Sequence, residues 1–172
     1  AGVVLSCAEA GVKVVSCEKP IAAQLSQADE LVRRCRELGT ILGCGTARWC
    51  PYIDRIIDWI RAGNIGPLTG VAMPKGLERE VSGGACHDLV LMRLLAGREV
   101  EWAEGWTLPP LPSFANPEAA DDTEVDCPAY GRLGLSGGIV CEIPQPNPEL
   151  PCRVWVEGEA GQVWLAPPRP VL

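Results

Sequence analysis

Apolar residues follow two different patterns along the chain, and the change between them lies near residue 97. Before it, segments with apolar residues at i, i+3, i+4 and i+7 alternate with short apolar runs, which predicts helices alternating with strands. After it, short alternating runs separated by glycine-containing turns predict hairpins. The expected fold class is α/β, with part of a parallel sheet followed by an α+β domain that has an open, mostly antiparallel sheet.

Glycines, prolines and a serine mark the ends of the expected elements. Ser26 is the expected N-cap of the second helix. Helices are expected over 1–11, 26–39, 51–63 and 85–96. Strands are expected over 12–18, 40–45, 68–73 and 99–107, followed by a proline-rich loop over 107–120 and hairpins turning at 136–138 and 158–161. The first two strands are so uniformly apolar that we expect them to be buried on both faces.

The helix that begins at Pro51 separates the two expected architectures. Its inward stripe is formed by isoleucines, namely Ile53, Ile56, Ile57 and Ile60. We therefore expect two domains, 1–50 and 51–172. Two buried strands are too few for a parallel sheet covered by helices on both faces, so we expect further strands before Ala1.

Composition and charge exclude several classes of partner. Twenty-two acidic residues against 15 basic ones give a net charge of -7, which argues against nucleic acid and against an anionic membrane surface. No run of 18 apolar residues predicts a membrane span, and the N-terminus has no signal-like pattern, so a cytoplasmic location is expected. The nine cysteines lie singly and the chain has one histidine, so we expect buried reduced thiols and no metal.

The tripeptide Glu18-Lys19-Pro20 directly follows the expected strand at 12–18. This position is the carboxyl end of a parallel strand, where open α/β sheets bind their ligands, and Pro20 can adopt the cis form there. The alternative is an ordinary strand-to-helix turn with a surface ion pair.

Four motifs follow one another in a recognisable order: the E-K-P tripeptide, the Arg-x-x-Pro of Arg48–Pro51, the G-x-I-G of Gly63–Gly66, and a GG-x-x-H segment that contains His87. The runs AGVKVVSCEKPIA, GTARWCPYIDRIIDWIRAGNIGPL and GGACHDLVLMRLLAGREVEWAEG carry them. Over most of its length the chain resembles the Gfo/Idh/MocA family, named after glucose-fructose oxidoreductase and inositol dehydrogenase.

This resemblance implies an NAD(P)-dependent oxidoreductase that transfers a hydride between a nicotinamide and a hydroxyl-bearing carbon of a sugar, polyol or related small molecule. Residues 1–50 would be part of a Rossmann-like domain that binds NAD or NADP. Residues 51–172 would bind substrate and mediate oligomerisation through the antiparallel sheet. The alternative is a non-catalytic binding or oligomerisation module, or an inactive fragment of that family.

The resemblance also implies roles for individual residues. Lys19 would lie beside the nicotinamide and the substrate hydroxyl, where an ammonium can polarise the oxygen. Glu18 would contact the ribose or orient the site, Pro20 would fix the turn, and Arg48 would contact the cofactor. His87 would be the second catalytic residue and a substrate contact, because an imidazole that titrates near neutral pH can take the hydroxyl proton.

Trp49 and Tyr52 would be further substrate contacts. For each of these residues a packing role is the alternative, and for His87 it is a helix-start histidine whose hydrogen bonds are satisfied by the backbone.

Two departures from the family pattern affect these roles. Gly83 and Val90 stand where the family often has aspartates around the histidine. The dinucleotide motif G-x-G-x-x-G is absent, since the run that begins at Gly43 has Arg48 in place of the third glycine. That motif belongs to the first β-α unit of such a domain, which is expected before Ala1.

Four tryptophans fall in the expected antiparallel sheet, namely Trp102, Trp106, Trp155 and Trp164. They predict a homo-oligomer that associates through this sheet. The alternative is that they fill the space between the sheet and its helices.

Overall fold

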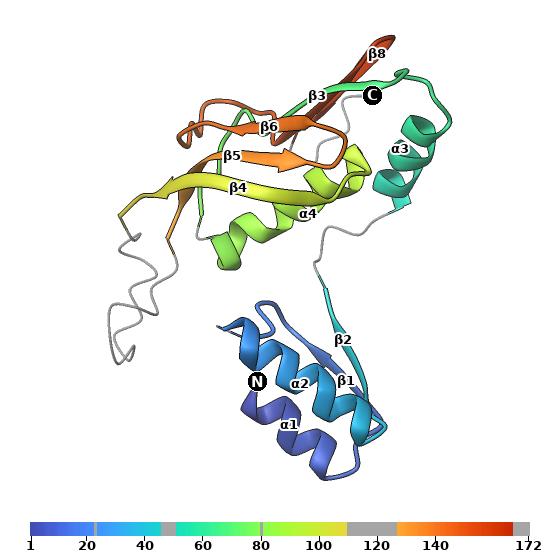
Figure 1. Ribbon diagram of the computed structural model, residues 1–172, viewed down its shortest axis with the longest axis vertical. Coiled ribbons are helices and arrows are strands. Elements are labelled where there is room, and N and C mark those ends of the chain that lie inside the picture. The colour runs from blue at the N-terminus through green and yellow to red at the C-terminus, as the bar shows by residue number, and fades with distance from the viewer. Residues whose placement is uncertain (23, 46–50, 80, 110–126, 167–172) are drawn as a thin grey trace. The chain divides into compact units, whose positions relative to one another are not determined.

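The computed structural model divides the chain into two units, Ala1–Ala47 and Arg48–Leu172, which are described separately (Figure 1). It describes residues 1–22, 24–45, 51–79, 81–109 and 127–166. The first unit contains α1 (Gly2–Glu9), β1 (Val14–Cys17), α2 (Leu25–Glu37) and β2 (Ile41–Cys44). The second contains α3 (Pro51–Arg61), β3 (Leu68–Ala72), a π-helical turn (Val81–Ala85), α4 (Cys86–Ala96), β4 (Val100–Thr107), β5 (Ala129–Leu135), β6 (Ile139–Ile143), β7 (Val154–Gly158) and β8 (Gly161–Leu165).

The first unit is a parallel pair of strands with two helices on one face. β1 and β2 pair from Val14↔Ile41 to Cys17↔Cys44. α1 packs on α2 and β1, and α2 packs on β2. The helices and the strand positions that face them form a small core around the buried side chains Val4, Ala8, Leu31 and Cys35.

Two sequence predictions about this unit are wrong. The strands are not buried on both faces, because both helices lie on the same face and the alternate residues Val14 and Ile41 are 63% and 68% exposed. Ser26 is not the N-cap of α2, since the helix already begins at Leu25 and Gln24 takes the extended N-cap conformation.

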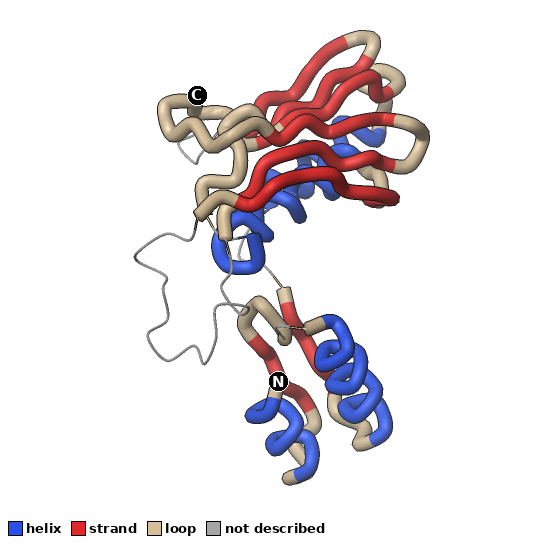
Figure 2. The backbone as a smooth tube through the Cα atoms, turned by 60° about the vertical axis from the view of Figure 1, so that its left-hand side comes forward, coloured by secondary structure: helices blue, strands red, loops and turns tan. Residues whose placement is uncertain are grey.

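The second unit is built on a six-stranded sheet in the order β4-β5-β6-β3-β7-β8. Its neighbouring strands are antiparallel except for β3 and β6, which run parallel. Helices lie on one face of this sheet, and its other face is open (Figure 2). The predicted fold class, a parallel sheet followed by an open, mostly antiparallel sheet with helices, is confirmed.

The core of the second unit lies between the sheet and helices α3 and α4. From the helices it receives Ile53, Ile57, Leu91, Met92 and Leu95, and from the sheet and its connections Val71, Met73, Cys141, Val154 and Val156. The predicted isoleucine stripe of α3 is confirmed, because Ile56 and Ile60 pack against the same cluster. Among the described residues, no helix is long and apolar enough to cross a membrane.

Glycines allow the two hairpin turns that the sequence predicts. Gly137 and Gly138 have φ of 87° and 77° between β5 and β6, a conformation that side-chain-bearing residues rarely adopt. At the turn between β7 and β8, a Cβ on Gly158 would lie 2.2 Å from the carbonyl oxygen of Ile65. The proline-rich loop predicted over 107–120 falls mainly outside the described residues.

The cysteines differ in exposure. Cys35, Cys141 and Cys152 are buried as predicted, whereas Cys44 is exposed at the end of the short strand β2. The core burial of Cys141, and to a smaller extent the charge of Glu142, raise the pKa of the Cys141 thiol to about 12.

This difference predicts selective alkylation. At about pH 8 the thiolate that reacts with iodoacetamide is scarce at Cys141, so Cys44 is expected to be modified at least about 100-fold faster. Mass spectrometry of peptides from the briefly treated native chain measures both rates, and guanidinium-unfolded chain is the control in which both react. Similar native rates at the two positions would contradict the burial of Cys141.

Candidate functional site

The E-K-P tripeptide leaves the carboxyl end of β1. Because β1 and β2 are parallel, their carboxyl ends lie at the same edge of the pair, next to Glu18 and Lys19. The Lys19-Pro20 peptide bond is cis, as the sequence suggested for this position. Lys19 is half-buried, whereas Glu18 and Pro20 are exposed. This segment therefore occupies the strand edge at which open α/β sheets bind ligands.

His87 is the second residue of α4 and is half-buried, with its Nδ1 atom fully buried. The π-helical turn at Val81–Ala85, which the sequence did not predict, leads directly into this helix. Leu91, Met92 and Leu95 anchor α4 in the core, and Gly97 ends it in the left-handed conformation. A well-anchored helix therefore positions the only histidine of the chain.

The other predicted site residues lie near the start of α3 or before it. Tyr52 is the second residue of α3 and is 48% exposed. Arg48 and Trp49 fall outside the described residues. α3 and α4 are in contact, so Tyr52 and His87 belong to neighbouring helices of the second unit, while Glu18, Lys19 and Pro20 belong to the first.

A small polar pocket adjoins the start of α4 and was not predicted. It measures about 60 Å³ and is lined by Glu78, Arg79, Gly84, Ala85, Asp88 and Arg153. Arg153 Nη1 donates a hydrogen bond to Asp88 Oδ1 at 3.3 Å, and Lys75 forms an ion pair with Glu78 at 2.9 Å. The sequence gives a signal for Asp88, which follows His87 directly, but none for Arg153, which is 65 residues away along the chain.

The departures from the family pattern have structural counterparts. Gly83 lies in the π-helical turn and Val90 in α4, so neither position offers a carboxylate beside the histidine. The carboxylate nearest in sequence, Asp88, accepts the hydrogen bond from Arg153.

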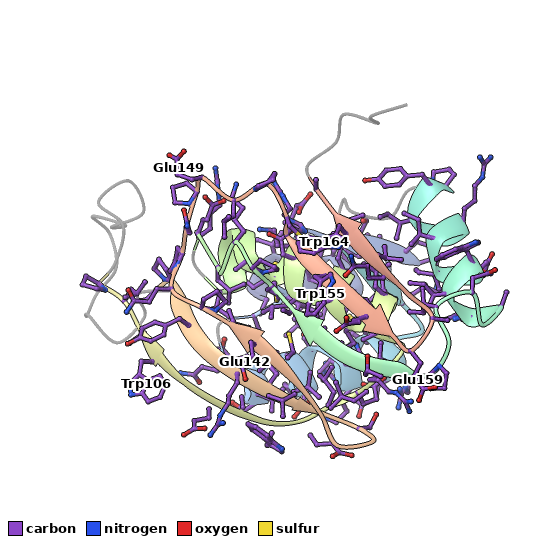
Figure 3. The ribbon with its side chains drawn as sticks, turned by 90° about the horizontal axis from the view of Figure 1, so that it is seen from above. Trp106, Glu142, Glu149, Trp155, Glu159 and Trp164 are labelled. Carbon is purple, nitrogen blue, oxygen red and sulfur yellow. The ribbon has the colours of Figure 1, made fainter. Side chains whose placement is uncertain are left out.

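The open face of the six-stranded sheet is rich in aromatic side chains. Strand alternation places Trp102 and Trp106 of β4 on the same face as Trp155 of β7 and Trp164 of β8. Figure 3 looks onto this face, where Trp106, Trp155 and Trp164 lie on different strands. Trp102, Trp106 and Trp164 are 44%, 58% and 55% exposed, so they do not fill the space between the sheet and its helices.

Neighbouring side chains hold these rings in place. Trp106 stacks on Tyr130 with ring centroids 5.6 Å apart, and Trp155 contacts Trp164 at 5.8 Å. Arg132 lies over the ring of Trp102 at 5.9 Å. The aromatic surface formed by these four tryptophans is therefore ordered across the sheet.

Comparisons with known proteins find similarity in structure. The sequence matches no protein-family model and no curated protein. An inositol dehydrogenase homolog from Azotobacter vinelandii, complexed with NADH and myo-inositol, matches 96% of this chain with a TM-score of 0.74 and 16% identity. An aldose-aldose oxidoreductase from Caulobacter crescentus, complexed with glycerol, matches 96% with a TM-score of 0.72 and 23% identity. A probable dehydrogenase from Thermotoga maritima matches 99% with a TM-score of 0.64 and 20% identity.

The chain spans about half the length of these solved structures, since it covers 47%, 52% and 55% of them. Both units are included in the matches, which extend over nearly all of the chain. The chain therefore has a fold that solved sugar and polyol oxidoreductases share. The fold that the motif resemblance implied is confirmed.

Proposed function

We propose that this chain is part of an NAD(P)-dependent oxidoreductase that transfers a hydride between a nicotinamide and a hydroxyl-bearing carbon of a sugar or polyol. The observation that supports this most strongly is the fold match over 95–99% of the chain to oxidoreductases, several of them crystallised with NAD+ or NADH. In this proposal residues 1–50 belong to the cofactor-binding domain and residues 51–172 to the substrate-binding domain.

The first unit fits one side of a nicotinamide cofactor. The carboxyl edge of a parallel strand pair, with the half-buried Lys19 beside it, suits a ligand that carries a polar ring and hydroxyl groups. Glu18, Lys19, Pro20 and Arg48 would hold the cofactor, which supplies hydride transfer when it is bound.

The chain's own residues would bind the substrate oxygen and transfer the hydroxyl proton. The Lys19 ammonium donates a hydrogen bond to the substrate oxygen and stabilises negative charge on it. The His87 imidazole accepts the hydroxyl proton when the alcohol is oxidised and returns it when the carbonyl is reduced. Trp49 and Tyr52 would contact the substrate.

Replacing Lys19 tests this cofactor site directly. We expect NADH to bind the chain saturably and Lys19→Ala to weaken binding about tenfold or more, because a charged hydrogen-bond donor is removed. A titration that follows NADH fluorescence measures the affinity. Lys13→Ala is the matched control. Lys13 is exposed and precedes β1, whereas Lys19 follows it, so this substitution is expected to leave binding unchanged. Equal affinities for wild type and Lys19→Ala, or no binding to the wild type, would contradict the site.

The open sheet face is proposed to bind a second copy of the chain. Exposed tryptophans from two strands at opposite edges of the sheet, Trp106 of β4 and Trp164 of β8, form part of one face. Extended aromatic surfaces of this kind mark protein interfaces, where tryptophan contributes more binding energy than most residues. The antiparallel sheet therefore supports a homo-oligomer.

A further inference from the structure

Among the residues that the structure describes, those in and beside the polar pocket at α4 carry an excess of positive charge. Five charged side chains gather in and beside it, namely Lys75, Glu78, Arg79, Asp88 and Arg153. The carboxylates of Glu78 and Asp88 pair with Lys75 and Arg153. Arg79 forms no ion pair or hydrogen bond with any residue in the described part of the chain. Among the described side chains here, three cations face two anions, so the Arg79 guanidinium has no ion-pair partner in that part of the chain.

Arg153 also retains hydrogen-bonding capacity. Its Nη1 donates to Asp88, but its Nε is buried and has no hydrogen-bond acceptor among the described residues. The Arg153 and Asp88 side chains are only 22% and 18% exposed, so solvent compensates this donor poorly. A buried donor without an acceptor is unfavourable, and a ligand oxygen in the pocket would satisfy it.

Gly84 brings the Arg79 side chain close to the pocket wall. A Cβ at position 84 would lie 2.3 Å from Arg79 Cδ and 2.7 Å from its Cβ, so the arginine stem packs directly on the glycine backbone. Because Gly84 of the π-helical turn has no side chain, Arg79 can line the same pocket as Arg153. Two guanidinium groups on one small pocket form a typical oxyanion site, because their planar forks match the oxygens of carboxylate and phosphate.

We propose that this pocket binds an oxyanion group of the substrate, a carboxylate or a phosphate, through Arg79 and Arg153. The inference rests on the proposed function, which it narrows to acidic sugars or polyols. A volume of about 60 Å³ has room for one such group but not for a sugar ring. Asp88, which lines the pocket, directly follows His87 in α4, so the pocket lies beside the helix start that carries the histidine.

Binding measurements on the 172-residue chain test this without any catalytic step. Isothermal titration calorimetry at low salt compares glucuronate, glucose 6-phosphate and glucose as probes. We expect an acidic probe to bind at least about tenfold more tightly than glucose, and Arg79→Gln to remove this preference. The preferred acidic probe identifies the oxyanion as carboxylate or phosphate. Arg98→Gln, an exposed arginine beyond the opposite end of α4, is the matched control and is expected to retain the preference.

The outcomes separate this inference from the proposed function. Equal binding of all three probes, no binding of any, or an undiminished preference in Arg79→Gln overturns the oxyanion pocket, whether or not NADH binds. Competition between NADH and the preferred probe also overturns it, because the pocket would then belong to the cofactor. An acid preference lost in Arg79→Gln supports the pocket even if the chain fails to bind NADH, which would contradict only the proposed cofactor site. Circular dichroism of Arg79→Gln confirms that the exposed substitution leaves the fold intact.

Discussion

Gly158→Ala is expected to destabilise the sheet unit by about 3 kcal/mol or more, the upper end of the cost of overpacking a core. The added Cβ would lie 2.2 Å from the Ile65 carbonyl oxygen, 2.9 Å from its carbon and 3.0 Å from the Gly66 oxygen. These atoms cannot move aside easily, because Ile65 is 1% exposed and its carbonyl accepts a hydrogen bond from the Ala160 N–H at 2.8 Å. The close approach of backbone to backbone therefore requires glycine.

Urea unfolding followed by tryptophan fluorescence measures this effect in one unit alone, because all six tryptophans lie in the second unit. Gly161→Ala is the matched control in the same hairpin. A Cβ there would meet its nearest atom, Ile65 Cγ2, at an ordinary 3.8 Å, so a loss of about 1 kcal/mol or less is expected. Equal unfolding midpoints for the two variants would show that the connection around Ile65 yields to the added methyl group.

The double substitution Trp106→Glu and Trp164→Glu is expected to convert an oligomer of the chain into an 18.4 kDa monomer. Each exposed ring would be lost from the interface and replaced by a charge that must be desolvated, so the dissociation constant should rise more than about 100-fold. Sedimentation velocity over a range of concentrations measures the species present. The fold should survive, since neither ring belongs to the core.

Trp59→Glu provides the control for that experiment. Trp59 is 47% exposed but lies on α3, on the helix side of the sheet, so its replacement should leave the oligomer unchanged. A wild-type chain that sediments only as a monomer would contradict the interface. If Trp59→Glu dissociates the oligomer equally, the interface lies on another surface.

Local sequence signals predicted most elements of the fold correctly. The apolar stripe of α3 and the glycines that end α1, α2 and α4 are properties of consecutive residues, so they can be recognised without a structure. The burial of β1 and β2 could not be predicted in this way. Apolar runs indicate strands, but the number of faces covered depends on which other segments pack there.

The same distinction applies to the candidate site. Lys19 and His87 were recognisable because short motifs surround them, and the cis bond before Pro20 is a local property. The polar pocket combines the π-helical turn with Arg153 on the connection before β7, a juxtaposition that only the folded sheet creates. The same applies to the open aromatic face, whose tryptophans come from β4 and from the hairpin of β7 and β8, with β5 and β6 between them along the chain.

The position of β3 in the middle of the sheet affects the order in which the protein can be assembled. β3 ends at Ala72, yet both of its neighbours, β6 and β7, begin only at Ile139 and Val154. During synthesis from the N-terminus, β1 and β2 can pair as soon as both have left the ribosome, whereas β3 remains without either partner while about 70 further residues are added. The apolar faces of β3, α3 and α4 must therefore be shielded from aggregation until β6 and β7 have been made, and the β7–β8 hairpin completes the sheet.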